Sequence, residues 1–361
     1  MRSWVEVSLR QIRANFRAVR ALVGDSVEVM PVVKADAYRH GAVAVSHALE
    51  AEGARWLAVS NAEEGIALRQ AGTQSRILVM ADFLENERDM LATHNLTPVI
   101  HSLEDLSAVR VPYHLKIDTG MNRLGTCAAP DEIARAVAAA PAPLEGLMTH
   151  LASSGNYESK QTEEQLQRFE AVKEGLRRVG ITPRYVHCSA STPVVYRRRE
   201  AWGNLVRPGH AIYGYVSPAR GAPAKALSVA PALTWKVTVL EVKDVAAGAL
   251  IGYGGIHRAA RPMRIAVIAA GYADGIPHRL GNRGQVIVKG KLAPVVGAVS
   301  MDLTTIDVTD CADLKAGDAV MLLGTEGGVS INAQQMAKWA GTISYAVLCG
   351  IHARVKRVYI D

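Results

Sequence analysis

The sequence has few of the features that mark secreted, zinc-binding or membrane-spanning proteins. Its 361 residues contain four cysteines, widely spaced and without a Cys-x-x-Cys pair, which argues against a disulfide framework or a zinc site. No stretch approaches the roughly 18 uninterrupted apolar residues of a membrane span. Arg2, Glu6 and Arg10 precede any apolar run long enough for a signal peptide. We therefore expect a cytoplasmic protein that holds no metal and inserts into no membrane.

The chain also has no block of charge of one sign. Its net charge of +7 comes from basic residues that are spread along the sequence. The longest basic cluster, Arg197-Arg198-Arg199, is followed at once by Glu200, so it is interpreted as a solvated helix face. We expect no nucleic-acid partner, whereas the overall basicity favours anionic small molecules.

Length and patterning predict two domains, because 361 residues exceed the usual ceiling for one hydrophobic core. Between residues 27 and 207, short apolar runs alternate with segments that carry apolar residues at helical spacing. An eightfold alternation of this kind is typical of a (β/α)8 barrel, predicted here over residues 1–226. The expected strands are Val27–Val33, Trp56–Ser60, Arg76–Met80, Thr97–Ile100, Tyr113–Asp118, Leu144–His150, Tyr185–Ser189 and Leu205–Arg207, and the expected helices include Ala42–Glu52, Asn61–Ala71, Asp131–Ala140 and Thr162–Val179.

Residues 227–361 predict a mostly-β domain, because long β-branched runs there are punctuated by Gly and Pro. Residues 1–9 lie outside the strand and helix repeat and are expected to pair with this second domain. The predicted fold class is therefore α/β, with an N-terminal barrel and a C-terminal mostly-β domain. The expected elements are strands at Leu233–Val245, Arg264–Ala270, Gln285–Val288, Val295–Val308 and Ala319–Leu323, a helix over Ile331–Ala340 capped by Ser330, and a last strand around Arg354–Ile360.

Lys34 is the most informative residue, because it follows the first predicted strand at the edge where active sites of barrels gather. A lone amine at the mouth of a buried strand, with the Tyr38 hydroxyl one helical turn away, is typical of a lysine that forms a Schiff base with pyridoxal phosphate. The alternative is a surface lysine that caps a strand. Other strand ends carry polar groups, namely Lys116, Asp118 and Arg123 at the fifth, His150 at the sixth, His187, Ser189 and Ser191 at the seventh, and Arg207 at the eighth.

The segment after the eighth predicted strand is suited to a phosphate. Gly209 lets the backbone come close to a ligand with its amides available, and the hydroxyl of Ser191 can reach the same anion. Taken singly, Gly209 is equally well part of an ordinary turn, and a histidine such as His150 is more often a hydrogen-bonded core residue. Their convergence at one end of the barrel favours a cofactor site.

Short motifs follow one another in a recognisable order along the chain. They are Val33-Lys34-Ala35-Asp36-Ala37-Tyr38 with Gly41, Lys116-Ile117-Asp118-Thr119-Gly120-Met121-Asn122-Arg123-Leu124-Gly125, Thr149-His150, Arg207-Pro208-Gly209, Gly252-Tyr253-Gly254, Gly271-Tyr272-Ala273-Asp274-Gly275 and Ser300-Met301-Asp302. In this set the chain resembles the bacterial alanine racemases, pyridoxal-phosphate enzymes of fold type III, along essentially its whole length. The lysine motif alone would be less specific, because related barrels that bind the same cofactor share variants of it.

The resemblance implies the cofactor contacts. Lys34 would form the Schiff base with pyridoxal phosphate, and Arg207 would face its pyridine nitrogen. Arg123 would hydrogen-bond the phenolic oxygen of the cofactor, steadied by Lys116, which in many relatives carries a carbamate formed from carbon dioxide. His150 would lie beside the cofactor. The phosphate would be held by Tyr38, Ser191, Tyr345 and the backbone around Gly209 and His210.

The resemblance also implies a reaction, the interconversion of L-alanine and D-alanine, which supplies D-alanine for peptidoglycan. Racemisation removes the α-proton from one face and returns a proton to the other, so two acid–base groups are needed on opposite sides of the cofactor. The resemblance assigns these roles to Lys34 and Tyr253. We hypothesise that His150 and Arg207 lower the pKa of Tyr253 through hydrogen bonds and positive charge.

Substrate contacts are implied for Arg123, Met301 and Tyr272, with Tyr253 and Met301 delivered by the partner subunit of a head-to-tail homodimer. Two other hypotheses stay open, a racemase for serine or lysine on the same scaffold and a non-catalytic pyridoxal-phosphate carrier. A fold-related decarboxylase is disfavoured, because Arg207 stands where those enzymes generally have an acidic residue. A carrier would have no use for a second domain that contains Tyr253.

Several positions depart from the family pattern, among them Ser344 and Ala346, which flank Tyr345 where many relatives carry Asn and Glu. Ala190 stands where relatives usually have Asn, so both Ser189 and Ser191 are candidates for the phosphate contact, and Ser191 is favoured. His210 replaces the usual aliphatic residue after Gly209, and a contact through its backbone amide would survive this change.

Overall fold

The computed structural model describes residues 1–81 and 87–361 and divides into two compact units. The barrel unit comprises Gln11–Ala37 and Ala42–Ala230, and the β unit comprises Met1–Arg10, Tyr38–Gly41 and Pro231–Asp361. Among the helices described, none is both long enough and apolar enough to span a bilayer.

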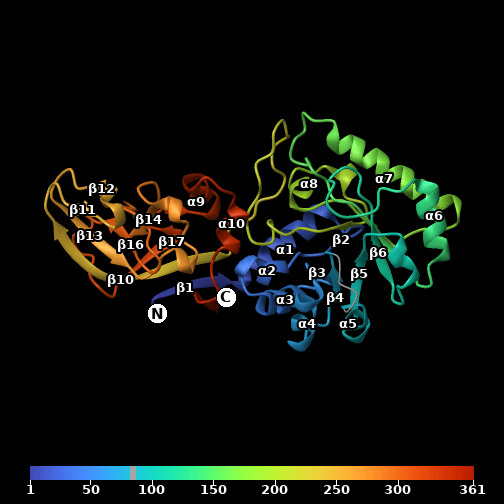
Figure 1. Ribbon diagram of the computed structural model, residues 1–361, viewed down its shortest axis with the longest axis horizontal. Coiled ribbons are helices and arrows are strands. Elements are labelled where there is room, and N and C mark those ends of the chain that lie inside the picture. The colour runs from blue at the N-terminus through green and yellow to red at the C-terminus, as the bar shows by residue number, and fades with distance from the viewer. Residues whose placement is uncertain (82–86) are drawn as a thin grey trace. The chain divides into compact units, whose positions relative to one another are not determined.

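The barrel unit confirms the predicted fold class. Six parallel strands, β3 to β8, pair in sequence order, and β2 pairs with β9 in the same direction (Figure 1). Two hydrogen bonds join this strand pair to the two edge strands of the sheet. After β2, the amide of Val33 donates to the carbonyl of Ala58 in β3 at 2.8 Å. After β9, the amide of Arg207 donates to the carbonyl of Ser189, which follows β8, at 2.9 Å. The strands are β2 (Glu28–Val29), β3 (Trp56–Val59), β4 (Arg76–Val79), β5 (Leu96–Ile100), β6 (Tyr113–Lys116), β7 (Leu144–Met148), β8 (Tyr185–His187) and β9 (Leu205–Val206).

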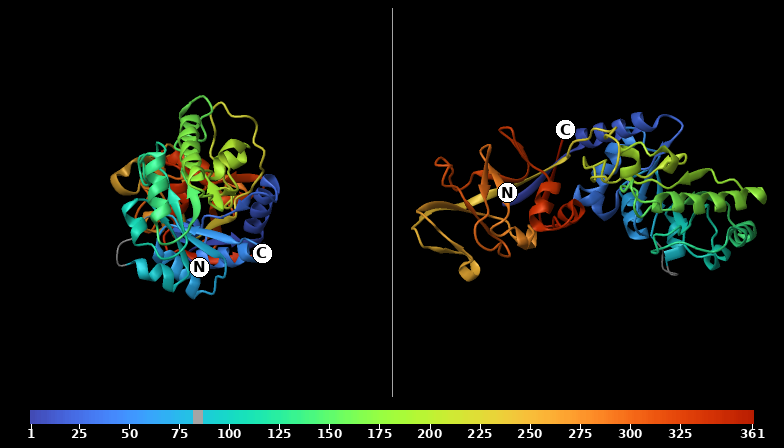
Figure 2. Two further views of the ribbon diagram at one scale, coloured as in Figure 1. Left: turned by 90° about the vertical axis from the view of Figure 1, so that its right-hand side faces the viewer. Right: turned by 90° about the horizontal axis from the view of Figure 1, so that it is seen from above.

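Helices cover the outside of these strands, since both faces of a parallel sheet must be buried. Helices α6 and α7 pack against each other outside the strands, as Figures 1 and 2 show. Phe169, Val172 and Leu176 of α7 are buried in one cluster with Leu115 and Leu147 from the strands. The helices of this unit are α1 (Leu9–Val23, whose first residues belong to the β unit), α3 (Ala42–Ala51), α4 (Ala62–Gln70), α5 (Arg88–Thr93), α6 (Pro130–Ala139), α7 (Gln161–Arg178) and α8 (Ser191–Val195).

The β unit is built on a largely antiparallel sheet in the order β15-β14-β17-β10-β1-β19, with β13 and β16 continuing from β10. The N-terminal strand β1 pairs antiparallel with β10 and parallel with β19, the last strand of the chain. The strands are β1 (Ser3–Ser8), β10 (Leu233–Val245), β11 (Leu250–Ile251), β12 (His257–Arg258), β13 (Met263–Ile268), β14 (Gln285–Val288), β15 (Lys291–Pro294), β16 (Thr304–Asp307), β17 (Ala319–Glu326), β18 (Val329–Ile331) and β19 (Lys356–Ile360), and the helices are α9 (Ala333–Ala340) and α10 (Ser344–Cys349).

Two predicted boundaries in the β unit are wrong. The run predicted as one strand over Val295–Val308 is regular only in β16, because Gly297 has a φ of 77° and the chain turns before Thr304. Ser330 does not cap the helix, since it lies in β18. The cap is Asn332, whose Oδ1 accepts the amides of Gln334 and Gln335 at 3.0 and 2.9 Å.

The prediction of a solvated helix face at Arg197–Arg199 holds only in part, because Arg197 and Arg199 are exposed but Arg198 is not. Arg198 is buried, its guanidinium carbon lies 4.7 Å from the centroid of the Tyr157 ring, and its Nε donates to Glu200 at 3.1 Å. A guanidinium plane stacks readily on an aromatic face, and this contact removes the central arginine from solvent.

Candidate functional site

Lys34 lies directly after Val33 and begins α2 (Lys34–Arg39). From Ala35 to Arg39 every φ lies between 53° and 65°, so the chain follows a left-handed turn and not an ordinary right-handed helix. This conformation costs about 1–2 kcal/mol per residue for L-amino acids, so contacts from elsewhere must hold it. One such contact is Glu64, whose carboxylate accepts the amides of Ala35 and Ser60, both at 2.7 Å.

Four cationic side chains lie near the C-terminal ends of the barrel strands. They are those of Lys34, Lys116, Arg123 and Arg207. Lys116 ends β6 and is 5% exposed. Burial first, and then the charges of Arg123, Arg207 and Lys34, lower the pKa of Lys116 to about 8, while Asp118 acts in the opposite direction. None of the four cations forms an ion pair with a described residue. The cluster is therefore a site for an anion.

Asp118 shapes the loop that carries Arg123. Its Oδ1 accepts the amides of Gly120, Met121 and Asn122 at 2.9, 2.9 and 3.1 Å. Its Oδ2 accepts the amide of Arg123 at 3.2 Å. Burial acts to raise the pKa of Asp118, but these amide hydrogen bonds outweigh it and hold the pKa below its ordinary value. The carboxylate is thus an internal acceptor for the loop.

Arg207 is buried after β9 and donates to carbonyl oxygens and imidazoles. Its Nη1 donates to Nδ1 and to the carbonyl of His187 at 2.6 and 2.9 Å. Its Nη2 donates to the carbonyls of Thr149 and Cys188 at 2.9 and 3.2 Å and lies 3.4 Å from Nδ1 of His150. Burial lowers the pKa of Arg207 to about 10, which still leaves it charged at neutral pH. Its Nε–H makes no hydrogen bond within residues 1–81 and 87–361, so one donor is available to a ligand.

Three neutral imidazoles surround this guanidinium. Because Nδ1 of His187 accepts from Arg207, its Nε2 carries the proton and donates to Nδ1 of His114 at 2.8 Å. Burial is the main cause that lowers the pKa of His114 to about 3 and that of His187 well below its ordinary value. Burial, then the charge of Arg207 and those of the other three cations, lowers the pKa of His150 to about 3. The imidazoles therefore accept hydrogen bonds and add no charge.

A separate set of donors gathers where α8 begins. The Oγ of Ser191 accepts the amides of Gly209 and Ala211, both at 3.1 Å. The hydroxyl of Ser189 instead donates to the carbonyl of Ala201 at 2.7 Å. His210 is buried, and its ring stacks on that of Tyr215 with the centroids 5.1 Å apart.

Tyr38 and Tyr345 lie together in the β unit. Their ring centroids are 5.9 Å apart with the planes tilted by 47°. Burial, followed by the proximity of Tyr345 and Cys349, raises the pKa of Tyr38 above its ordinary value, so this hydroxyl stays protonated and is able to donate.

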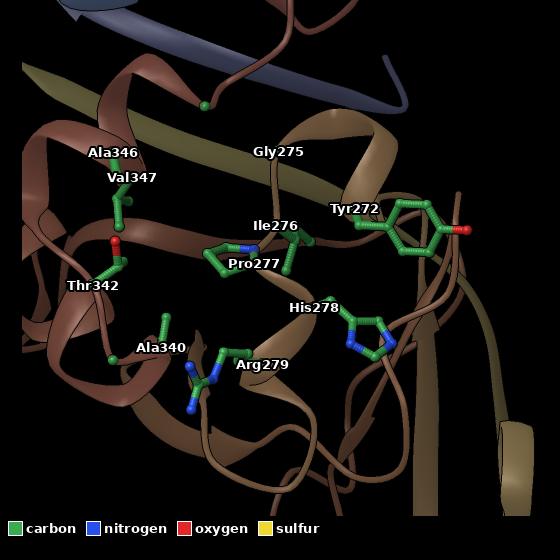
Figure 3. A pocket seen from close by; sticks show the side chains of 12 residues that line it. Tyr272, Gly275, Ile276, Pro277, His278, Arg279, Ala340, Thr342, Ala346 and Val347 are labelled. Atoms are coloured by element: carbon green, nitrogen blue, oxygen red, sulfur yellow. The ribbon is translucent and has the colours of Figure 1, made fainter.

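The other predicted residues of the β unit lie on its surface. Tyr253, in the short turn η4 (Tyr253–Gly255), is 78% exposed, Tyr272 is 45% exposed and Met301 is 54% exposed. Tyr272 is one of the residues that line a cavity of about 550 Å³. Figure 3 shows its hydroxyl directed away from the other labelled side chains. The Tyr272 and His278 rings meet edge to face with centroids 6.1 Å apart.

The structure thus brings together Lys34, Lys116, Arg123, His150 and Arg207 in the barrel unit. It also gathers the donors around Ser191, and it pairs Tyr38 with Tyr345. Sequence reasoning missed Glu64 and the acceptor role of Asp118. The sequence signal for Glu64 is its place four residues after the predicted strand end at Ser60.

Comparison with known proteins gives full-length matches. The chain matches the alanine racemase N-terminal domain over residues 7–218 and the C-terminal domain over residues 232–359. It is 39% identical over 370 residues to an alanine racemase of Symbiobacterium thermophilum, covering 99% of this chain and 97% of that protein. An alanine racemase structure from Clostridium difficile has a TM-score of 0.92 at 32% identity, covering 100% and 96% of the two chains. One from Bartonella henselae with covalently bound pyridoxal phosphate has a TM-score of 0.88 at 26% identity and covers both chains completely.

Proposed function

Because this chain belongs to the alanine racemase family, we propose that Lys34 and Tyr253 exchange the α-proton as it interconverts L-alanine and D-alanine. The chain is an isomerase that depends on pyridoxal phosphate. The observation that carries the assignment of Lys34 is its place beside Lys116, Arg123 and Arg207, a cationic cluster at the C-terminal ends of the barrel strands.

The donor set of the barrel unit fits this cofactor. A phosphorylated pyridine needs an anion donor at one end and a donor for its ring nitrogen. The hydroxyl of Ser191 suits the first need, because its oxygen is held by the amides of Gly209 and Ala211 and its O–H remains able to donate. The uncommitted Nε–H of Arg207 suits the second. Ser191 is favoured over Ser189, because the Ser189 hydroxyl is already committed to a carbonyl. The protonated hydroxyl of Tyr38, with Tyr345 beside it, is assigned to the same phosphate.

Bound pyridoxal phosphate supplies an electron-withdrawing ring that acidifies the α C–H bond of the substrate amino acid. Arg207 limits this withdrawal. A guanidinium that stays charged at neutral pH donates a hydrogen bond to the ring nitrogen without transferring its proton, whereas a carboxylic acid would transfer one. The α carbon is then reprotonated quickly, and transamination is suppressed.

Lys34 carries the proton on one face at its Nζ. The left-handed turn that follows Lys34 is held by Glu64, so the backbone from which the lysine side chain extends has a fixed position. Proton transfer needs such positioning, because it takes place over hydrogen-bonding distance. Tyr253 carries the proton on the opposite face at its hydroxyl. His150 is neutral and accepts from Arg207 through Nδ1, so its Nε2–H is the donor that would stabilise the tyrosinate form of Tyr253.

We further propose a head-to-tail homodimer in which Tyr253 and Met301 serve the partner's site. Both side chains are more than half exposed, which is unusual for a large apolar side chain and suits a surface that another subunit covers. Arg123, Met301 and Tyr272 are assigned to the substrate, which they would crowd enough to favour a methyl side chain. None of the four cysteines is in a disulfide, which supports a cytoplasmic location.

Mixing two inactive variants tests the shared site. Lys34→Ala and Tyr253→Phe should each abolish most activity, and random reassociation of equal amounts should restore about a quarter of wild-type activity, since half of the dimers then contain one intact site. Absence of any recovery in verified mixed dimers would contradict the exchange of Tyr253 between subunits.

Borohydride reduction tests Lys34 independently. Reduction of the holoenzyme should fix the chromophore covalently on the peptide that contains Lys34. Turnover of L-serine and L-lysine beside L-alanine then tests specificity, and a clear preference for either larger amino acid would reject alanine as the main substrate.

A further inference from the structure

Two neighbouring turns of the β unit carry Tyr272 and Met301, two of the three side chains assigned above to the substrate. The amide of Tyr272 donates to the carbonyl of Ser300, and the amide of Ala273 donates to that of Met301, both at 3.0 Å. A Cβ at Gly271 would overlap these two carbonyl oxygens, so only glycine permits this approach. The two turns therefore move as one piece.

Tyr272 and Met301 are 45% and 54% exposed, so packing within their own chain holds these side chains only in part. Their positions follow from the backbone of the two turns, and a small displacement of either turn would move them relative to a substrate. A residue that ties both turns to the rest of the unit would thus control the shape of the substrate pocket.

Arg354 makes such a connection. Its Nε and Nη2 donate to Oδ1 and Oδ2 of Asp274, in the first turn, at 2.7 and 2.9 Å. Its Nη2 also donates to Oδ1 of Asp302, in the second turn, at 2.6 Å. Asp274 is buried and its Oδ2 also accepts the amide of Gly271 at 2.9 Å, whereas the Asp302 side chain is 51% exposed.

The segment that carries Arg354 is itself held firmly. The amide of His352 donates to the carbonyl of Asp274 at 3.0 Å. Val355 is fully buried, and β19 begins directly after it, with Lys356 opposite Trp4 of β1. The guanidinium therefore projects from a fixed point toward both turns.

We infer that Arg354 is a positioning residue, which through Asp274 and Asp302 fixes where Tyr272 and Met301 meet the substrate. This inference rests on the proposed function of those two side chains. A planar guanidinium presents a rigid fork that meets both oxygens of Asp274 while it also donates to Asp302. The compact ammonium of a lysine has no such fork, so Arg354→Lys keeps the charge but loosens the connection.

The experiment measures racemisation of L-alanine and L-serine by the holoenzyme in four forms. They are wild type, Arg354→Lys, Asp302→Asn, and Lys243→Ala, which removes an exposed ion pair to Glu241 elsewhere in the unit. For Arg354→Lys we expect the KM for L-alanine to rise about fivefold with kcat within about twofold, and the serine-to-alanine ratio of kcat/KM to rise about fivefold. Asp302→Asn should change both in the same direction by less, and Lys243→Ala should change neither.

Thermal melts identify any variant that fails to fold. If Arg354→Lys unfolds, the test rests on Asp302→Asn alone. This variant should fold, because the Asp302 side chain is half exposed and its replacement leaves no unpaired charge buried. A folded Asp302→Asn with unchanged KM and an unchanged serine-to-alanine ratio would then overturn the inference. A fall in kcat alone for Arg354→Lys would also overturn it, since that result indicates a merely structural role. If the wild-type holoenzyme had no racemase activity, the proposed function itself would be contradicted, and not only the role of Arg354.

Discussion

Carbon dioxide should modify Lys116, because the environment of this residue disfavours the charged amine. The fall of its pKa from 10.5 to about 8 raises the neutral fraction at pH 7 from roughly 0.03% to roughly 9%, an increase of about 300-fold. Only the neutral amine attacks carbon dioxide. The product is an anionic carbamate, which would pair with Arg123 and remove the repulsion within the cationic cluster.

The same change should stabilise the fold. At about 1.4 kcal/mol for each pKa unit, the lowered pKa means that charged Lys116 destabilises the folded protein by about 3 kcal/mol at pH 7. The sign follows from the lower pKa in the folded state, so the penalty is full below about pH 8 and disappears above the unfolded value of 10.5. Carbamate formation relieves it, and added bicarbonate should raise the melting temperature at neutral pH.

The assay uses carbon-13-labelled bicarbonate near pH 8 and records the carbamate carbonyl resonance together with a thermal melt. Lys116→Met is the test variant, because it keeps an unbranched apolar stem and removes the amine. Lys160→Met is the matched control at an exposed lysine. A resonance of equal strength in wild type and Lys116→Met would refute the reasoning. The reasoning would also be refuted if wild type gave no carbamate resonance and bicarbonate left its melting temperature unchanged.

Three further outcomes are expected. Ser191→Ala should raise the dissociation constant for pyridoxal phosphate about tenfold or more in equilibrium dialysis, as loss of a hydrogen bond to a charged group implies, whereas an equal effect of Ser189→Ala would contradict the assignment. Asp118→Ala should lower the free energy of unfolding by about 1–3 kcal/mol in urea titrations at pH 7, since the loop amides lose their acceptor. Because folding lowers the pKa of Asp118, wild type should keep this contribution at neutral pH and lose it only as the pH falls through the lowered pKa of the folded state. Tyr253→Phe should impair the L-to-D and D-to-L proton exchanges unequally, and deuterium exchange from each enantiomer that falls by the same factor would count against its role on one face.

The barrel strands could be predicted to within a few residues, because strands buried on both faces are continuous apolar runs. The segment from Trp56 to Val59 is wholly buried, and its predicted end differs from the observed end by one residue. The β unit was harder, because its elements end where single residues change the backbone direction. Gly297, with its positive φ, interrupts the β-branched run, and Asn332 caps α9 where Ser330 was expected.

The site shows a different division between what could and could not be predicted. The positions of its polar residues follow from the strand ends, so Lys116 and Arg207 could be assigned to one edge of the barrel from the sequence. The direction of each polar group could not, because it depends on partners distant in the sequence. Ser189 and Ser191 are two residues apart, yet one hydroxyl bonds the carbonyl of Ala201 and the other lies between two amides after β9.

The left-handed turn after Lys34 could not be predicted from local sequence. Residues 35–39 contain no glycine, and alanine and arginine are strong formers of the right-handed helix. Five residues in the left-handed region cost about 5–10 kcal/mol together, so the conformation exists only because other segments hold it. Glu64 satisfies the amide at its start, and Asp36 accepts the amide of Ala42 at 2.7 Å where α3 begins. Strain on this scale, next to the reactive amine, indicates that the backbone position of Lys34 is tightly fixed. Proton transfer at Lys34 needs a fixed backbone, whereas a surface lysine does not.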